Sequence, residues 1–211
     1  MIIDKLVVSP LGMNCYIVSC EKTKDAIVID AGDEPKVILD FIQKKDYNLK
    51  YLINTHAHVD HVSAVYEIKK QTEVPFILHK KEIPILDTLI LSQDLYGFGD
   101  HQKPEIDSFI DPDKIYEVGE VKIKVIETPG HTPGGVCFLV DNVIFVGDSL
   151  FYGSIGRTDL PGGSTSELMS SLRTKLMVLD ESLVVYSGHG PETTIGFEKS
   201  NNPYINDESY C

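Results

Sequence analysis

The sequence predicts an α/β fold in which two β-sheets pack face to face and helices cover their outer faces. The chain of 211 residues is long enough to bury one sizeable core. It divides into two halves, and each half combines β-rich segments with segments of helical periodicity. No apolar run reaches the roughly 18 residues of a membrane span, and no repeat occurs. We therefore expect a single domain over residues 1–211, built as a layered sandwich.

The first half opens with three β-rich runs that we interpret as a meander. The runs IIDKLVVS, MNCYIVSC and DAIVIDAG are separated by Pro10, Gly12 and the polar stretch 21–24, all typical of turns. A helix is expected over 35–45, because proline is favoured in the first helical turn and apolar residues then recur at helical spacing. Strands and helices then alternate. Strands are expected at 50–55 and 75–79, and helices at 61–71 and at 80–92, the latter interrupted near Pro84.

The second half follows a predicted loop over residues 92–114. Its first three strands are expected at 121–128, 135–140 and 142–147, and a turn at Asp141-Asn142 joins the last two. A helix over 164–179, a strand over 183–188, a short final helix and a polar tail complete the chain.

The charge and the cysteines narrow the class of protein. The formal net charge is −13, so nucleic acids and anionic membrane surfaces would be repelled, and neither is expected as a partner. The four cysteines form no C-x-x-C pair, and the N-terminal segment lacks the basic and apolar regions of a secretory signal. We expect a cytoplasmic protein with reduced thiols. The sequence makes no prediction of its oligomeric state.

The most informative run is His56-Ala57-His58-Val59-Asp60-His61. With seven histidines and 18 aspartates in the chain, the pattern H-x-H-x-D-H has a chance probability on the order of one in a thousand. The run follows a predicted strand and precedes a predicted helix, a place that ligand sites in α/β sheets favour. Buried imidazoles and carboxylates without partners cost roughly 1–3 kcal/mol each, and a bound metal removes that cost.

Three further polar residues follow β-rich runs and lie beside glycines. They are His131 in ETPGHTPGG, Asp148 in NVIFVGDSLF and His189 in VVYSGHGPE. Four strand ends are therefore expected to converge on one rim. Imidazole and carboxylate ligands suit zinc, iron or manganese, so we expect an open, catalytic metal site.

Taken in order, THAHVDH, TPGHTPGG, VGDSLF and SGHGPET resemble the metal motifs of the metallo-β-lactamase superfamily, across almost the whole chain. The resemblance implies a four-layer αβ/βα sandwich and two divalent metal ions, zinc first, with iron or manganese as alternatives. The ligands it implies are His56, His58 and His131 for one metal, Asp60, His61 and His189 for the other, and Asp148 as the bridge.

The resemblance also implies the chemistry. A water between the two metals becomes a hydroxide and attacks a carbonyl carbon, while the cations polarise the carbonyl and stabilise the leaving group. Asp60, besides being a ligand, is implied to orient that hydroxide and is therefore a candidate catalytic residue.

Within the superfamily, the segment 148–159 and the run GHGPETTIGFEKSNNPY resemble the glyoxalase II group in its short, single-domain form. These enzymes cleave thioesters such as S-lactoylglutathione, so the implied partner is a small-molecule thioester, including glutathione conjugates. Arg157 matches the position of a lysine that binds glutathione in the group, although Asp159 stands where a tyrosine is common. Class B β-lactamases lack a histidine at the position of His61 and carry cysteine at that of Asp148, so antibiotic hydrolysis is not expected.

Two other functions remain open. Persulfide dioxygenases resemble this chain in their ligand motif and in the run G-R-T-D, yet use one iron and dioxygen. A non-catalytic metal-binding or scaffold protein is disfavoured, because every ligand position is filled.

Several individual residues also leave alternatives open. Arg157 could bind substrate or only pair with Asp159 in a turn. Tyr96 and Phe98 could flank the substrate or pack beneath their loop. We expect His79 and His101 at the surface, Cys137 buried in a strand and Cys211 as an exposed thiol in the tail.

Overall fold

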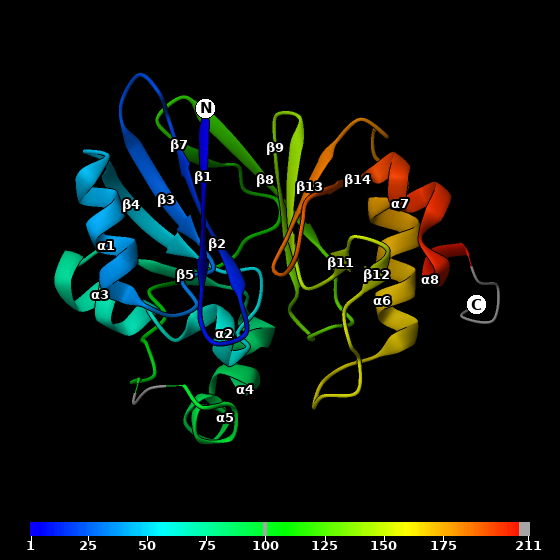
Figure 1. The fold of residues 1–211 in the computed structure, drawn as a ribbon, viewed down its shortest axis with the longest axis horizontal. Coiled ribbons are helices and arrows are strands. Elements are labelled where there is room, and N and C mark those ends of the chain that lie inside the picture. The colour runs from blue at the N-terminus through cyan, green and yellow to red at the C-terminus, as the bar shows by residue number, and fades with distance from the viewer. Residues whose placement is uncertain (99–100, 207–211) are drawn as a thin grey trace.

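Two sheets lie face to face in the centre of the molecule, and helices cover the outer face of each (Figure 1). The structure is a computed structural model that describes residues 1–98 and 101–206. Helices α1 and α3 cover one sheet, and α6, α7 and α8 cover the other. This arrangement of helix, sheet, sheet and helix confirms the predicted α/β class and the four-layer αβ/βα architecture.

The first sheet has six strands, whose order in space is their order in sequence. Its strands are β1 (Ile2–Val8), β2 (Met13–Ser19), β3 (Asp25–Ile29), β4 (Asn48–Ile53), β5 (Phe76–Leu78) and β6 (Ser108–Phe109). The first three form the predicted antiparallel meander. Strands β3, β4, β5 and β6 run parallel to one another. Its helices are α1 (Pro35–Lys44), α2 (Val59–Val62), α3 (Val65–Thr72), α4 (Ile83–Leu86) and α5 (Leu89–Tyr96), with a 3-10 turn at Lys80–Glu82.

The second sheet also has six strands, in the spatial order β14-β13-β10-β9-β8-β7. Its strands are β7 (Tyr116–Val118), β8 (Val121–Glu127), β9 (Val136–Val140), β10 (Val143–Gly147), β13 (Val184–Ser187) and β14 (Thr193–Thr194). A separate small hairpin pairs β11 (Leu150–Phe151) with β12 (Ser154–Ile155). The helices of this half are α6 (Thr165–Ser171), which continues into a π-helical turn at Leu172–Leu176, α7 (Ile195–Asn201) and α8 (Pro203–Asn206).

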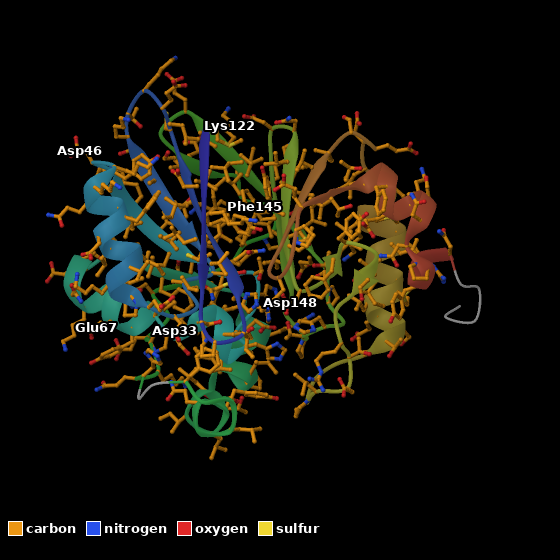
Figure 2. The ribbon with its side chains drawn as sticks, viewed as in Figure 1. Asp33, Asp46, Glu67, Lys122, Phe145 and Asp148 are labelled. Carbon is orange, nitrogen blue, oxygen red and sulfur yellow. The ribbon has the colours of Figure 1, made fainter. Side chains whose placement is uncertain are left out.

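Strand β2 shows why the layers form, because all seven of its residues are buried. Successive side chains of a strand point to opposite faces of its sheet. Cys15 and Ile17 therefore pack in the cluster beneath α1 and α3, while Tyr16 and Val18 pack in the cluster between the two sheets. Figure 2 shows Phe145, from β10, among the side chains that fill this inter-sheet space.

The region from Lys80 to Asp113 differs from its prediction. The helix expected over 80–92 is broken into three short pieces, in keeping with an interruption near Pro84. The loop expected over 92–114 is wrong in two places: α5 continues to Tyr96, and β6 adds an edge strand beside β5 within the segment. Residues 99–100 and Cys211 lie outside the described residues. Among the described helices, none is long and apolar enough to cross a membrane.

Candidate metal centre

The run from His56 to His61 forms the loop after β4 and the short helix α2. Strand β4 pairs in parallel with β3 and β5, so this loop leaves the carboxyl edge of the sheet, where ligand sites gather. His58 has an extended backbone (φ −63°, ψ 153°) and directly precedes α2. The rings of His56 and His58 are 4.8 Å apart with their planes at 90°, so the two imidazoles converge from one loop.

The second half of the chain delivers three more side chains to the same place. The ring of His131, from the loop after β8, lies 4.8 Å from that of His56 and 4.6 Å from that of His58. Asp148 and His189 follow β10 and β13, which pair in parallel and therefore end at the same edge of their sheet. The strand ends that were predicted to converge do so.

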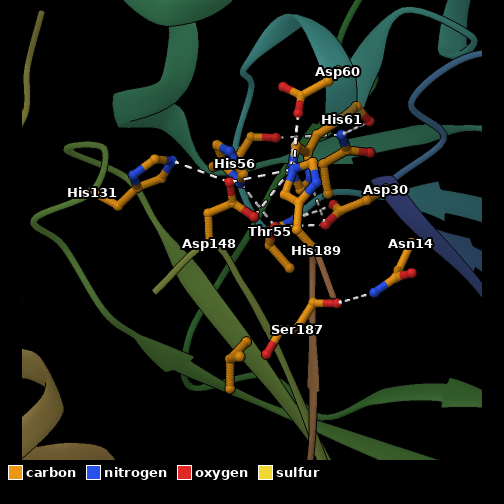
Figure 3. A network of polar contacts seen from close by, with 12 residues as sticks. Asn14, Asp30, Thr55, His56, Asp60, His61, His131, Asp148, Ser187 and His189 are labelled. Atoms are coloured by element: carbon orange, nitrogen blue, oxygen red, sulfur yellow. Dashed lines mark hydrogen bonds and ion pairs between the residues drawn. The ribbon is translucent and has the colours of Figure 1, made fainter. Parts of the chain in front are cut away.

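The converging side chains form two groups around Asp148 (Figure 3). The first ligand set is His56, His58 and His131, and the second ligand set is Asp60, His61 and His189. Within each set the candidate ligand atoms lie within 4.8 Å of one another. Asp148 lies between the sets: its Oδ1 is 3.3 Å from His61 Nε2, and its Oδ2 is 3.8 Å from His131 Nε2 and 3.7 Å from His189 Nε2.

Buried polar atoms in this cluster lack hydrogen-bond partners. They are Nε2 of His56, His61 and His131 and Oδ1 of Asp148. A buried polar atom that makes no hydrogen bond is uncommon and costly, and an ion is one of the explanations it calls for. The donors are imidazole nitrogens and carboxylate oxygens, the ligands of zinc, iron and manganese in open catalytic sites. The residues present therefore fit two divalent cations.

Asp30 organises one histidine from each ligand set, and the sequence reasoning missed it. Its Oδ2 accepts the Thr55 hydroxyl at 2.7 Å and lies 3.0 Å from Nδ1 of His61. Thr55 Oγ1 is in turn 3.0 Å from Nδ1 of His56. Both imidazoles thus use Nδ1 for orientation and turn Nε2 towards the centre, the usual arrangement for histidines that ligate metals. Asp30 directly follows β3, which lies beside β4. This position after a strand is the feature of the sequence that could have identified Asp30 as part of the site.

Asp30 also forms a third group of close candidate ligand atoms, with His56 and His61. Its oxygens are already engaged, because Oδ1 accepts the Thr55 N–H at 2.7 Å and Oδ2 accepts the Thr55 hydroxyl. We therefore interpret Asp30 as a positioning residue and not as a third ligand set.

Glu82, also missed at the level of sequence, connects two ligand loops. Its side chain is fully buried, and its two oxygens accept the N–H groups of Ala57 at 2.8 Å and Gly134 at 2.7 Å. Ala57 lies between His56 and His58, and Gly134 lies three residues after His131. One carboxylate therefore ties together the two loops that carry the first ligand set.

Two glycines allow backbone to approach the cluster closely. A Cβ on Gly188 would lie 2.2 Å from Asp148 Oδ1 and 2.6 Å from His61 Cε1, and one on Gly156 would lie 1.8 Å from the Asp148 carbonyl oxygen. Arg157 directly follows Gly156. The carbonyl oxygen of Arg157 accepts a hydrogen bond from Nδ1 of His131 at 2.7 Å. The G-R part of G-R-T-D thus orients a candidate ligand through the backbone.

The electrostatics of the cluster favour the metal-binding protonation states of His56, His58 and Asp148, whereas the carboxylates around His61 favour its protonated form in the absence of metal. Burial, reinforced by His131, lowers the pKa of His58 to about 3, and burial with neighbouring imidazoles also lowers the pKa of His56. Burial opposes ionisation of Asp148, but His61 and the other imidazoles hold its pKa well below the ordinary value. For His61 burial acts in the lowering direction, yet the surrounding carboxylates, Asp148 first, raise its pKa. Neutral imidazole and ionised carboxylate are the forms that bind metal.

The other two histidines lie outside both ligand sets; the predicted surface placement is wrong for His79, whereas His101 is partly exposed. His79 is buried: its Nδ1 accepts the Lys81 N–H at the start of the 3-10 turn, and its Nε2 is 3.2 Å from Glu127 Oε1. The side chain of His101 is 16% exposed, and its Nε2 is 3.2 Å from Asp33 Oδ1. Each histidine has a carboxylate partner, which offsets the cost of burying His79 and of partly burying His101.

A cavity of about 630 Å³ opens onto both ligand sets, within the size range of small-molecule sites. Arg157 and Tyr96 line it, whereas Phe98 is buried in the core cluster next to α1 and α3. The Arg157 guanidinium donates to Asp159 through Nε at 2.7 Å and Nη2 at 2.8 Å. The structure therefore shows the ion pair, and contact between Arg157 and a substrate stays a prediction. Cys137 is buried, as predicted.

Comparison with known proteins identifies the family. A model of the metallo-beta-lactamase superfamily matches residues 8–189. The hydroxyacylglutathione hydrolase GloC of Haemophilus influenzae is 36% identical, over 99% of this chain and 100% of the relative. The structure of BLEG-1 B3 metallo-beta-lactamase superimposes with a TM-score of 0.90 at 33% identity, covering 98% of this chain and all of the other. TTHA1623 in a di-iron-bound form gives a TM-score of 0.87 at 33% identity, covering 95% and 99%.

The chain belongs to the metallo-β-lactamase superfamily. Its similarity to GloC confirms the resemblance to glyoxalase II that the motifs indicated. Membership of this superfamily of metal-dependent hydrolases, together with the clustered histidines and aspartates, identifies it as a metal-binding enzyme of the hydrolase class.

Proposed function

We propose that this enzyme is a thioesterase of glyoxalase II type, which hydrolyses a small thioester such as S-lactoylglutathione. The observation that carries the proposal is the pair of complete ligand sets around Asp148, at the wall of an open cavity. The similarity to GloC, whose name includes hydroxyacylglutathione hydrolase, supports the choice of substrate.

In this proposal, His56, His58 and His131 hold one divalent cation, and Asp60, His61 and His189 hold the other. Asp148 lies between them as the bridging ligand. Zinc is the proposed metal because all the donors are nitrogen and oxygen, although the di-iron form of TTHA1623 makes iron the first alternative and manganese the second. When bound, the metals lower the pKa of water towards neutrality and polarise a carbonyl group.

Asp60 is the proposed catalytic residue of the chain itself. It lines the cavity, its Oδ2 lies 3.0 Å from His189 Nε2, and its pKa is lowered by His61 and His189 against the effect of burial. An ionised carboxylate in this place accepts a hydrogen bond from the attacking water and orients it towards the carbonyl carbon. Water adds a hydroxyl group to that carbon, the C–S bond breaks, and the sulfur leaves as a thiol.

The proposal is tested by thiol release from S-lactoylglutathione, together with the metal content per chain and the identity of the metal. We expect stoichiometric thiol release, two metals per chain and no oxygen uptake. Absence of thiol release from all thioesters tried, by protein that carries two metals, would overturn the proposal.

A persulfide dioxygenase is the second candidate, because the chain carries Gly156-Arg157-Thr158-Asp159 in contact with the ligand cluster. Oxygen consumption with glutathione persulfide, by protein that holds one iron, would support it in place of the thioesterase. A β-lactam assay completes the comparison, since BLEG-1 is called a B3 metallo-beta-lactamase. We expect no β-lactam hydrolysis, because class B β-lactamases lack a histidine at the position of His61 and carry cysteine at that of Asp148.

We also infer that the enzyme acts in the cytoplasm on a small molecule and not on a nucleic acid or a membrane. Three buried, unpaired cysteines and the net charge of −13 support this inference. Fractionation of the cells that make the protein tests its location.

A further inference from the structure

The cavity beside the metal centre has an apolar wall built from both halves of the chain. Helices α4 and α5 contribute Ile85, Leu89 and Leu95, and the loop before α6 contributes Leu160 and Pro161 from the other half. Leu11, in the turn between β1 and β2, adds a further apolar side chain. The cavity therefore continues from the polar cluster into a hydrophobic compartment.

Part of this wall is exposed in a way that needs an explanation. The residues Leu11, Leu95 and Tyr96 are 48%, 75% and 39% exposed. Single exposed apolar residues are common, but a group of them that lines one cavity is typical of a binding surface. Covering these side chains with an apolar ligand would remove their surface from water.

Two hydroxyl groups of the same wall are engaged elsewhere. Thr88 Oγ1 donates to the Ile85 carbonyl at 2.8 Å, and Ser92 Oγ donates to the Thr88 carbonyl at 3.0 Å. Both hydroxyls thus donate to the backbone of their own helical region and not into the cavity.

Positive charge is also scarce. Arg157 is the only lysine or arginine among the described residues that line the cavity, and both oxygens of the Asp159 carboxylate accept from its guanidinium. The net charge of −13 adds long-range repulsion of anions. A strongly anionic group has little to bind it in the apolar compartment.

From these features we propose that the compartment formed by Leu11, Ile85, Leu89, Leu95, Tyr96 and Leu160 binds an apolar acyl group of a thioester, either an alkyl chain such as hexanoyl or an aromatic ring. The inference rests on the proposed thioesterase function and specifies its substrate. The carbonyl lies at the ligand sets and the acyl chain extends along α4 and α5. Biological thiols carry charged groups, so the thiol part remains towards solvent. Hydrolysis adds the water hydroxyl to the acyl carbon, giving a fatty or aryl carboxylic acid, and the proton goes to the sulfur.

The test compares glutathione thioesters that share the thiol and differ only in the acyl group. S-acetyl-, S-lactoyl-, S-butanoyl- and S-hexanoylglutathione are hydrolysed by the metal-loaded enzyme, and kcat/KM is measured for each. We expect kcat/KM to rise with acyl length, by at least about tenfold from acetyl to hexanoyl, because buried methylene groups favour binding. A flat or falling series overturns the proposal.

Variants of α5 test whether the preference for longer acyl groups comes from the apolar wall of the cavity. Leu95 lines the cavity and Leu91 does not, although both side chains are 75% exposed on the same helix. We expect L95S to lower the ratio of hexanoyl to acetyl kcat/KM by about threefold or more. The matched control L91S keeps the wild-type ratio. L11S, on a different element, lowers the ratio as L95S does, and equal ratios in L95S, L11S and wild type contradict the proposed compartment.

The outcome also separates the two proposals. If no thioester releases thiol, the thioesterase function fails and the acyl compartment fails with it. If thiol is released without preference for apolar acyl groups, the thioesterase function stands and only the assignment of the compartment is overturned.

Discussion

Asp148 is placed so that both ligand sets depend on it, because its oxygens lie near His61, His131 and His189. We expect D148A to lose metal and to lower kcat/KM for thioester hydrolysis by at least about 100-fold, since a ligand shared by two cations is removed. Metal analysis and thiol release measure the two effects. H101A is the control, because His101 pairs with Asp33 outside both sets, and it should retain metal and turnover. Unchanged turnover in D148A contradicts the assignment of the site.

Asp30 allows the effect of an orienting carboxylate to be measured separately from that of a ligand. We expect D30N to weaken metal affinity by about 10–100-fold while the fold is kept, because the amide nitrogen cannot accept a hydrogen bond and has to face either the Thr55 N–H or the Thr55 hydroxyl and the His61 Nδ1–H. Competition with a chelator gives the affinity. D33N, three residues away and paired with His101, should bind metal as wild type does. Equal affinities in D30N and D33N would show that Asp30 does not orient the ligands.

At the scale of elements, Glu82 joins the loop after β4 to the loop after β8. We expect E82Q to lower the free energy of unfolding by about 1–3 kcal/mol, since the amide nitrogen then faces a buried backbone N–H of Ala57 or Gly134. Urea denaturation of the isolated protein measures this. E120Q, which removes only the carboxylate of an exposed pair with Lys22, should have little effect. An unfolding midpoint of E82Q equal to that of E120Q argues against the proposed connection.

The longer elements could be predicted because periodicity and turn residues mark them, as in β1 to β3 and α1. The strands β6, β11, β12 and β14 have two residues each, and a pattern of two residues carries no period. They exist because a neighbouring strand offers backbone partners, which no local signal reveals. The part of helix α5 beyond residue 92 was predicted as loop. Its apolar residues do not mark a buried face, because Leu91 and Leu95 are apolar yet exposed, and the periodic pattern is therefore weak.

At the scale of the whole molecule, the convergence of the seven predicted site residues followed from their positions after strands. Their role as ligands stays a prediction for metal analysis to test. Asp30 and Glu82 were not predicted, because their contacts span 25 to 52 residues and look like ordinary core or helix positions in sequence. His79 was misplaced for the same reason: its partner Glu127 is distant along the chain.

Metal removal tests how the two halves hold together, since each ligand set combines side chains from both. Metal at 100 times its Kd stabilises a folded protein by about 2.7 kcal/mol per site, which corresponds to roughly 5–10 °C in Tm for a chain of this size. We therefore expect chelation to lower Tm by at least about 5 °C and re-addition of zinc to restore it. A Tm that is the same with and without bound metal contradicts a site shared between the halves.

The division of the ligand sets also has a consequence for biosynthesis. The first ligand set needs His131, and the second needs His189, whereas their other members all lie before residue 62. A nascent chain whose first sheet has already folded on the ribosome therefore presents two half-built sites and no complete one. In the proposed dinuclear site, the first cation can be acquired only after His131 has been synthesised, and the second only after His189 has been synthesised and β13 has paired with β10. Loading of the second cation would therefore be the last step of maturation and would report that the two sheets have packed together.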